Sequence, residues 1–446
     1  MELETASRDD LLALIAALRA LVAEQQTTIA TLEARVRDLE ARLGSGSPRG
    51  MPGLKPHSVP AEGPQRPRKR RTANHARRRS PPTHRVVHAL EHCPACGSAL
   101  VGGTVQRTRE VLEIVPTPVR VIEHVYVARQ CPLCRRRRVP KAELGARVLG
   151  RQRLGIRLVS LIATLREAGR WPIRTIQWYL RTVHHLRLST GAIVGACHAV
   201  ARQGQGAVAQ VREQIRASPA VHADETGWRE AGRNGYVWGF SSPAGCYFVR
   251  RGRNKEVVDE VLGPTFAGVL LSDFYGAYHH YAGVKQRCWA HLLRDIHDLT
   301  VLYPDDAGVQ AWALEVGAVY RRAVACQSAT ARERQWARRC YEQSLLGLCQ
   351  PYLADSTAPQ RRLCARIERH LSELFVFVVE PAVPPDNNAA ERSLRHLVTS
   401  RKISGGTRSA TGTETKMALS TLFGTWRAQG LNPLHACRQL LTQSGV

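Results

Sequence analysis

The stretch "PAVHADETGWRE" (219–230) decides how the larger part of the chain folds. Its first half is a short apolar run, typical of a buried strand, and the run ends at Asp224. Two further strand-like runs, "GYVWGFSS" and "CYFVRRG", flank a turn, and "NKEVVDEVLG" has the pattern of a helix. A fourth, apolar strand follows in "AGVLLSDFYGAY" (267–278) and ends at Asp273. The order therefore predicts an α/β domain with an aspartate at the end of its first and fourth strands.

Three strands in a meander, a helix and a fourth strand are similar to the opening of a ribonuclease-H-like sheet. In that arrangement the first and fourth strands are neighbours, so Asp224 and Asp273 would lie at adjacent strand positions. Two such carboxylates repel each other unless a cation lies between them, which is how Mg²⁺ sites are made. Each aspartate alone is also typical of a turn at a strand end, but together they favour a metal site.

A third carboxylate is expected from a later helix in "PPDNNAAERSLRHL" (384–397). The prolines stop regular structure, and Asp386 or Asn387 can cap the helix that follows them. Glu391 lies one turn inside this helix, at the border of its apolar face. We therefore predict that Glu391 is the third member of the site. The less favoured acids are Glu225, Glu230, Glu380 and Asp386.

The composition indicates a globular protein with a polyanionic partner. The 446 residues are enough for about two to four domains, and 43% of them are hydrophobic. The net charge is +27, and only seven of the 64 basic residues are lysine. Such a field favours nucleic acid, and arginine can bind a phosphate through two hydrogen bonds at once. No apolar run is long enough to cross a membrane, so we expect a cytoplasmic protein without a membrane partner.

Two Cys-x-x-Cys pairs, "CPAC" and "CPLC", predict a structural zinc site. The four expected ligands are Cys93, Cys96, Cys131 and Cys134. Two such knuckles supply the four thiolates of a closed tetrahedral Zn²⁺ site. The segment between them (108–130) alternates in the manner of strands, so residues 86–145 are expected to form a DNA-binding zinc ribbon. The alternatives are four unrelated buried cysteines or redox pairs.

Residues 1–45 are predicted to form a coiled-coil helix that joins two chains. A heptad repeat over 8–43 places β-branched residues such as Ile15 and Ile29 at one core position and leucines at the other. That pattern favours a parallel pair of helices, and Gln25 is a single polar interruption that can fix the register. The alternative is an amphipathic helix that packs on its own domain.

Residues 46–85 are expected to be a basic, disordered linker, because they are rich in Gly, Pro and Ser and have no apolar period. The second half is a dense basic run, typical of an arm that binds phosphates. The residues expected to bind DNA there are Arg68, Lys69, Arg70, Arg71, Arg77, Arg78 and Arg79. The alternative is a solvated spacer.

Residues 146–216 have the apolar spacing of several helices, one of them capped by Ser189 or Thr190. A helix, a short turn and a second helix with arginines outside are compatible with helix-turn-helix DNA binding, although most helical pairs are only packing units. The other predicted boundaries are 217–410 for the α/β domain, about 295–378 for a helical insertion within it, and 411–446 for a C-terminal helical tail.

Four motifs in order resemble those of the IS66 family of bacterial insertion-sequence transposases. They are "HADETGWR", "LLSDFYGAY", "CWAHLLRD" and "NNAAERSLRHLVTSRKISGG", and the likeness extends from the coiled coil to the C-terminal "ALSTLFGTWRAQGLNPLHACRQLL". The resemblance implies a DDE transposase with a ribonuclease-H-like fold and the catalytic triad Asp224, Asp273 and Glu391. A Cys-x-x-His pair, Cys288 and His291, either supports the active site or only packs.

The resemblance also implies two-metal catalysis of DNA cleavage and strand transfer. Two Mg²⁺ ions, with Mn²⁺ as a substitute, would lie about 3.5–4 Å apart on the phosphodiester that reacts. Asp224 would bridge both ions, and Asp273 and Glu391 would each hold one. The residues expected to hold DNA phosphates near this site are Arg395, Arg401 and Lys402.

The expected partners are the terminal inverted repeats of a bacterial element, its target DNA, a second copy of the chain and accessory proteins of the same element. The protein is expected to work in the cytoplasm, on the nucleoid. Two other functions compete with this one. They are a ribonuclease-H-like nuclease or resolvase without strand transfer, and a non-catalytic zinc-containing DNA-binding regulator. The complete set of three acids argues against the regulator.

Overall fold

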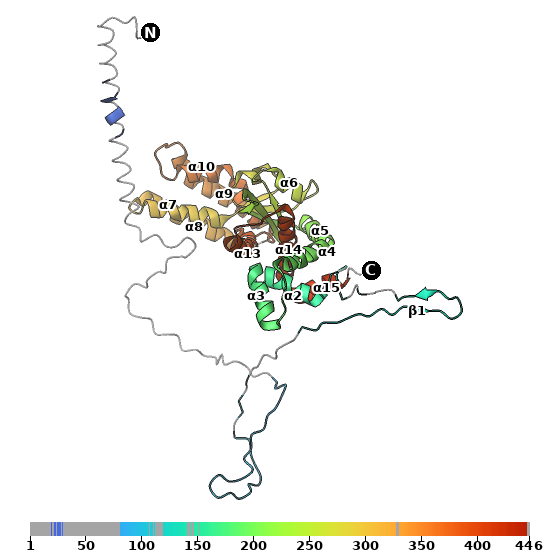
Figure 1. Ribbon diagram of the computed structural model, residues 1–446. Coiled ribbons are helices and arrows are strands. Elements are labelled where there is room, and N and C mark those ends of the chain that lie inside the picture. Colours follow the sequence, from blue (N-terminus) through green and yellow to red (C-terminus); the bar gives the residue numbers. More distant parts are fainter. Residues whose placement is uncertain are drawn as a thin grey trace. The chain divides into compact units, whose positions relative to one another are not determined.

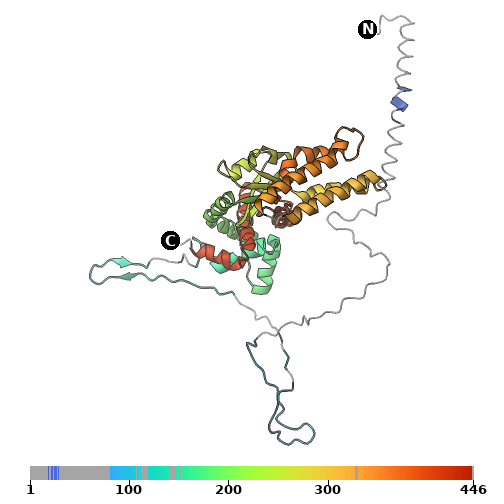
Figure 2. The same ribbon diagram turned by 180° about the vertical axis from the view of Figure 1, so that it is seen from behind.

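The computed structural model (Figures 1 and 2) describes residues 81–443, together with Arg19, 22–23, 25–27 and Ile29. Within 81–443 the gaps are 107, 110, 112–118, 141–143, 145–146, 151 and 327–329. The chain divides into two units, Met1–Leu112 and Glu113–Val446. Most of the predicted coiled coil and the basic linker, with all seven of its predicted DNA-binding residues, lie outside the described residues. The few described residues between 19 and 29 are helical.

A five-stranded sheet forms the centre of the second unit, with the strand order β5-β4-β3-β6-β7. The strands are β3 (Ala220–Glu230), β4 (Arg233–Ser242), β5 (Gly245–Arg251), β6 (Val269–Ser272) and β7 (Lys285–Arg287). The first three form an antiparallel meander, β6 runs parallel to β3, and β7 runs parallel to β6. The prediction that the first and fourth strands are neighbours is confirmed. The fifth strand, β7, was not predicted.

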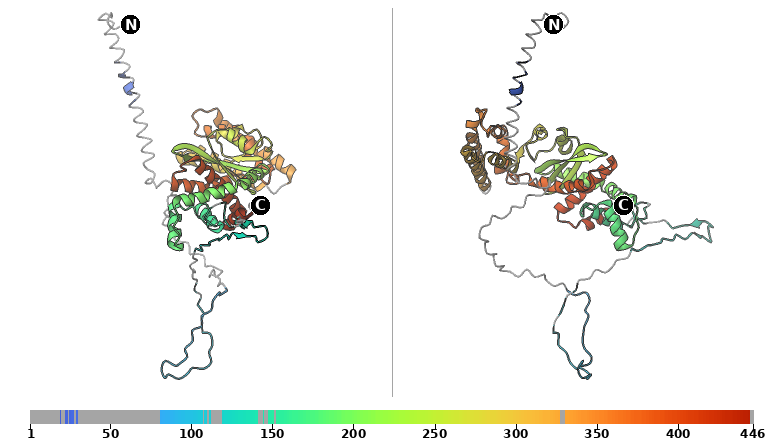
Figure 3. Two further views of the ribbon diagram at one scale, coloured as in Figure 1. Left: turned by 45° about the vertical axis from the view of Figure 1, so that its right-hand side comes forward. Right: turned by 60° about the vertical axis from the view of Figure 1, so that its left-hand side comes forward.

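Alternating side chains of β3 face the two sides of this sheet. Val221 and Ala223 lie in a core with α5 (Gln205–Arg216) and α6 (Glu256–Leu262). Trp228, on the opposite side, lies in a core with α13 (Asn388–Ser404) and α14 (Ala410–Ala428). Helices therefore cover both sides of the sheet, and Figure 3 shows the red C-terminal helices on one side of the green strands.

The chain between β7 and α13 forms a helical layer over the segment where a helical insertion was expected. Its helices are α7 (Trp289–Leu302), α8 (Ala307–Ala325), α9 (Ala331–Leu353), α10 (Arg361–Arg369), α11 (Leu371–Leu374) and α12 (Val376–Val379). They share one core, in which Trp289 and Phe375 are completely buried. The indole nitrogen of Trp289 donates a hydrogen bond to the Leu374 carbonyl, so this tryptophan is a core residue.

The helices before the sheet and those at the C-terminus share a second core. They are α2 (Ile156–Glu167), α3 (Ile173–His184), α4 (Thr190–Gln203), α14 and α15 (Pro433–Gln443). The Ser189 hydroxyl caps α4 by accepting a hydrogen bond from the Ala192 N–H. A buried ion pair joins Lys416 Nζ to Glu167 Oε2 at 2.7 Å. The helical segment and the C-terminal tail, which we predicted as separate parts, thus pack as one body.

The prediction of strands between the two cysteine pairs is wrong for residues 119–128, which the structure describes without strand pairing. In the described part of this region, β1 (Arg129–Gln130) and β2 (Arg137–Arg138) form a short antiparallel hairpin around Cys131 and Cys134, and a single antiparallel bridge joins His92 to Ala99 around the first pair. The alternating apolar side chains of 119–128 misled the prediction, because they are exposed and cover no core: Val121 is 93% exposed. Among the described residues, no helix is long and apolar enough to span a membrane.

Candidate functional sites

Asp224 and Asp273 lie at the same edge of the sheet, beyond the paired ends of β3 and β6. The parallel register ends at His222 opposite Leu271, two residues before each aspartate. Both carboxylates are half-buried and each accepts a backbone hydrogen bond. Asp224 Oδ1 accepts from the Glu225 N–H at 2.8 Å, and Asp273 Oδ1 accepts from the Tyr275 N–H at 2.9 Å. These bonds orient the two carboxylates. Asp273 follows the end of β6, but the predicted strand end at Asp224 is wrong, because pairing with β4 continues β3 to Glu230.

Glu391 reaches the same edge from the first turn of α13, and its side chain is 29% exposed. The pKa of Asp224 is raised to about 7, first by burial and then by the charges of Glu225, Asp273 and Glu391. The structure therefore brings the three predicted acids within electrostatic reach of one another. In the described part of the chain, no three His, Cys, Asp or Glu side chains already stand in a formed metal site. The clustered negative charge nevertheless suits a divalent cation, because carboxylate oxygens are the ligands that Mg²⁺ prefers.

Glu225 is an acid whose part in the site the sequence did not predict. Its side chain is only 4% exposed, and burial raises its pKa. Tyr278 donates a hydrogen bond to Glu225 Oε2 at 2.7 Å, and Arg253 forms an ion pair with Glu225 Oε1 at 2.8 Å. The guanidinium of Arg253 also stacks over the Tyr275 ring, 3.9 Å from its centroid. Glu225 is thus committed to these partners and acts on Asp224 through its charge.

Asn387 connects the start of α13 to β3 and α7. Its side chain is buried, donates to the Ala223 carbonyl at 2.7 Å and contacts His222 Nδ1 through Oδ1 at 3.0 Å. Its backbone N–H donates to Cys288 Sγ at 3.1 Å. Ala223 directly precedes Asp224, so these bonds hold the helix that carries Glu391 against the strand that carries Asp224.

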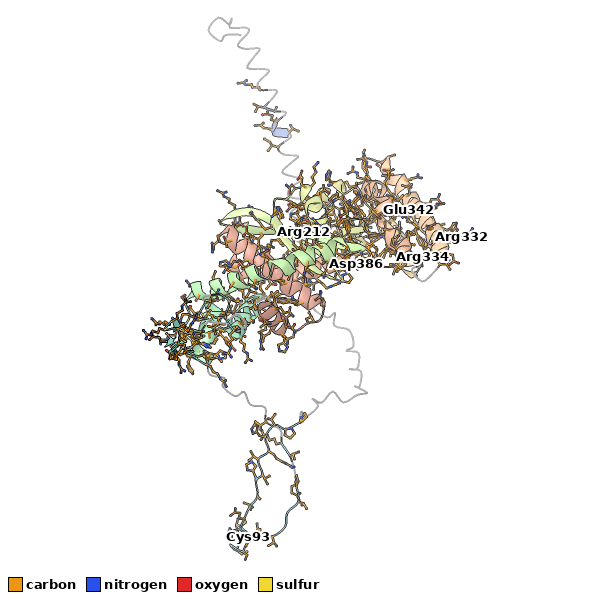
Figure 4. The ribbon with its side chains drawn as sticks, turned by 90° about the vertical axis from the view of Figure 1, so that its right-hand side faces the viewer. Cys93, Arg212, Arg332, Arg334, Glu342 and Asp386 are labelled. Atoms are coloured by element: carbon orange, nitrogen blue, oxygen red, sulfur yellow. The ribbon has the colours of Figure 1, made fainter. Side chains whose placement is uncertain are left out.

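The expected helix cap is corrected in one respect. Asn387 occupies the cap position, but its side chain makes no cap hydrogen bond to the helix because it points to β3 instead. Asp386, labelled in Figure 4, accepts a hydrogen bond from the Asn388 N–H through Oδ1 at 3.0 Å. The local aspartate therefore makes the turn, and the asparagine makes the long-range contact.

Cys288 and His291 lie at the start of α7 and both contact the α13 region. Cys288 is buried, and burial raises the pKa of its thiol. His291 Nε2 lies 3.6 Å from Glu391 Oε1. Neither residue joins a cluster of metal ligands in the described residues. His291 thus lies beside Glu391 while Cys288 packs in the interior, and support of the active site by this pair stays a prediction.

The three residues of α13 predicted to bind DNA differ in their surroundings. Arg395 and Lys402 are exposed. Arg401 donates through Nη1 to the Thr226 hydroxyl and the Gly227 carbonyl on β3. Arg401 therefore ties the helix to the sheet, a role that the sequence did not predict. DNA contact by these three residues stays a prediction.

The two Cys-x-x-Cys pairs adopt the same turn, although they belong to separate units of the chain. The backbone carbonyl of Cys93, labelled in Figure 4, accepts a hydrogen bond from the Gly97 N–H at 2.8 Å, and the carbonyl of Cys131 accepts one from the Arg135 N–H at 2.9 Å. Gly97 and Arg135 both have a positive φ. Hydrogen bonds with Ser98 lower the pKa of Cys96, and backbone hydrogen bonds from Cys134 and Leu133 lower that of Cys131. A lower pKa favours the thiolate, the form that binds zinc.

Comparison with known families identifies the class of protein. A family model described as "Transposase IS66 family" matches residues 151–415, more than half of the chain. A second, described as "zinc-finger binding domain of transposase IS66", matches residues 91–135. The chain therefore belongs to the IS66 family of transposases, as the motifs predicted. Membership makes it a DNA-binding, nucleic-acid-cleaving enzyme with a zinc-finger domain.

Three relatives from Sinorhizobium fredii are similar to this chain and are named only as uncharacterized proteins. Protein y4jD is 24% identical over 375 residues, which cover 76% of this chain and 72% of the relative. Protein y4qI is 25% identical over 272 residues, 52% of this chain and 49% of the relative. Protein y4jO is 39% identical over 74 residues, 17% of this chain and 23% of the relative. These names add no activity.

The raised pKa of Asp224 predicts how stability depends on pH without Mg²⁺ or Mn²⁺. The folded pKa of about 7 exceeds the ordinary value of 3.8, so the stability linked to this carboxyl is lost as pH rises from 4 through 7. We expect the free energy of unfolding of Asp224→Asn to exceed that of the wild type by about 2–4 kcal/mol at pH 8, and by a smaller amount at pH 5. Denaturant unfolding at both values measures this. The exposed Asp298→Asn is the control, and an equal pH effect in that variant would contradict the prediction.

The contacts of Asn387 predict a difference between two adjacent asparagines. Asn387→Ala leaves the buried Ala223 carbonyl and His222 without their partner, so we expect the free energy of unfolding to fall by about 1–3 kcal/mol. Asn388 is the next residue and is half-buried, so Asn388→Ala should change the free energy of unfolding by less than about 0.5 kcal/mol. Urea unfolding of both variants measures these changes. Equal losses of unfolding free energy would show that the contact of Asn387 with β3 does not stabilise the fold.

Proposed function

We propose that this transposase binds the ends of its own element and catalyses their cleavage and strand transfer at Asp224, Asp273 and Glu391. One observation carries the proposal: three acids from β3, β6 and α13 meet at one sheet edge, where burial and mutual repulsion raise the pKa of Asp224. Perturbed carboxylates with a shared charge partner are typical of active sites. Separate elements supply the three acids, so a purely local turn does not explain them.

The topology supports a ribonuclease-H-like fold for the catalytic domain. The sheet has an antiparallel meander, a helix, and then a strand parallel to the first one of the meander. This is the order that we expected for such a fold. The pairing of the first three residues of β3 with β6 involves no residue of the helical layer between β7 and α13.

The proposed chemistry assigns a separate task to each group of residues. Two divalent cations, when bound, neutralise the phosphodiester, activate the attacking oxygen and stabilise the leaving oxygen. Asp224, Asp273 and Glu391 would hold these ions, and His291 would orient Glu391 from 3.6 Å away. Arg395 and Lys402 would hold DNA phosphates farther along α13. No covalent protein–DNA intermediate is needed, so the proposal requires no Ser or Tyr nucleophile.

The proposed ancillary parts follow the predicted order along the chain. Residues 1–45 would join two copies through a coiled coil, and the basic run within 46–85 would bind DNA phosphates without sequence preference. The two cysteine turns would share one structural Zn²⁺. Accessory proteins of the same element are a further proposed partner.

The catalytic proposal predicts the effect of removing each acid. Asp224→Asn, Asp273→Asn and Glu391→Gln should each lower cleavage and joining of element-end DNA by on the order of 10³-fold, because each removes a metal ligand. The measurement uses the full chain, labelled end DNA, a target plasmid and Mg²⁺ or Mn²⁺. Glu315→Gln, an exposed acid on α8, is the control and should keep full activity.

The products of the same reaction separate the competing functions. Released ends that join the plasmid support the transposase. Released ends that never join would favour a ribonuclease-H-like nuclease or resolvase. Wild-type rates in Glu391→Gln would exclude the proposed catalytic triad and favour the DNA-binding regulator.

The zinc proposal predicts one Zn²⁺ per chain after purification without added metal. Cys93→Ser, Cys96→Ser, Cys131→Ser and Cys134→Ser should each lower the zinc content strongly, because a closed site needs all four thiolates. Elemental analysis of the purified proteins measures this. Cys326→Ser, at the end of α8, is the control. Full zinc content in any of the four variants would show that the substituted cysteine is not a zinc ligand.

A further inference from the structure

Helix α3 exposes a face that its own domain does not cover. Ile176 and Leu180 are buried on one side of the helix, in the core that α3 shares with α2 and α4. Arg174, Trp178 and Arg181 are exposed on the opposite side, and Trp178 is 55% exposed. The spacings of four and three residues place these side chains in one stripe, which His185 extends at the helix end. We call Arg174, Trp178, Arg181 and His185 the α3 face.

The segment of the chain that carries the α3 face is strongly positive. Between residues 147 and 212 the sequence contains eleven arginines and a single acid, Glu167. That acid is buried and paired with Lys416 Nζ at 2.7 Å, and it also accepts a hydrogen bond from Ser420. The one negative charge of the segment is therefore held inside the core and does not neutralise the surface. An exposed tryptophan between two arginines remains on that surface.

We propose that the α3 face is a docking surface for double-stranded DNA. The local charge selects the partner, because the arginines of residues 147–212 would repel the same face of a second copy and would attract a polyanion. The exposed indole favours a partner that offers apolar surface as well as negative charge, because an indole contributes binding free energy when apolar surface covers it. The identity of the DNA as an element end rests on the proposed function, but the surface itself does not.

The dimensions of α3 fit this partner. From Arg174 to His185 the stripe spans eleven residues, about 16 Å of helix, which corresponds to about five base-pair steps. The major groove admits one α-helix, so the two arginines can reach phosphates at its walls while Trp178 meets base edges or a thymine methyl group. The arginines would then supply salt-dependent affinity, and the tryptophan would supply a contact that salt does not weaken.

The test measures binding of the full, zinc-loaded chain carrying Asp224→Asn to duplex DNA from the element ends, without Mg²⁺ and over a range of salt concentrations. We expect Arg174→Ala with Arg181→Ala to lower the slope of log affinity against log salt by about two, one for each phosphate contact. We expect Trp178→Ala to weaken binding about tenfold while the slope stays unchanged.

Matched controls remove the same groups from the helical layer after β7. Arg321→Ala with Arg362→Ala removes two exposed arginines, and Trp336→Ala removes an indole that is 71% exposed. These variants should leave the affinity and the slope unchanged. We expect every variant to fold, because the substituted α3 residues are exposed and the core is unchanged. Circular dichroism checks this.

The proposal is overturned if the control pair lowers the slope as much as the α3 pair, or if Trp178→Ala binds DNA normally. A change of mass in light scattering by Trp178→Ala, with DNA binding intact, would instead identify a protein interface. Since the binding assay contains no catalytic metal, an inactive triad leaves its outcome unchanged. Failure of the α3 proposal and failure of the catalytic proposal are therefore distinguishable.

Discussion

Parallel pairing between β3 and β6 is the interaction on which the candidate active site depends. The paired register runs from Ala220 opposite Val269 to His222 opposite Leu271 and then stops. Because parallel strands end at the same edge of a sheet, the two following aspartates emerge side by side. A shift of one residue would turn one of them to the opposite side of the sheet. Antiparallel pairing of β3 with β4 on its other edge holds the strand in that register.

The cluster of acids opposes folding, and the surrounding contacts hold it in place. Burial and neighbouring charges raise the pKa of Asp224 to about 7, which means that its ionised form is unfavourable in the fold. Asn387 and Arg401 bind α13 to β3 with hydrogen bonds on either side of Glu391. Unfavourable electrostatic energy of this kind is common at functional sites, where a bound cation can offset it.

A second polar contact connects the helical body to the sheet. Lys416 on α14 pairs with the buried Glu167 on α2. Nine residues farther along the same helix, the Thr425 hydroxyl accepts a hydrogen bond from the Cys246 N–H of β5. A buried ion pair contributes little net stability, but a single unpaired charge in that place would be costly. The pair therefore fixes which surfaces of α2 and α14 meet, and it withdraws the single acid of residues 147–212 from the surface.

The limits of prediction are physical. The strand β6, with the sequence "VLLS", can be predicted from the sequence, because a strand that is buried on both faces needs a continuous apolar run. The strand β7 has the sequence "KQR" and gives no such signal. Its buried Gln286 and Arg287 bind Leu374 and Glu373, nearly ninety residues later in the chain. The alternating segment 119–128 shows the opposite error, since a strand pattern without a core to cover does not pair.

The sequence by itself determined the features that depend on neighbouring residues. These are the two apolar runs that are each followed by an aspartate, the glutamate one turn inside a helix, and the turns of the two cysteine pairs. Only the tertiary structure decided which polar side chains connect those features. Asn387 reads as a helix cap but binds β3, Arg401 reads as a phosphate ligand but binds Gly227, and Glu225 is occupied by Tyr278. Each of these partners is more than fifty residues away along the chain, so no local pattern contains it.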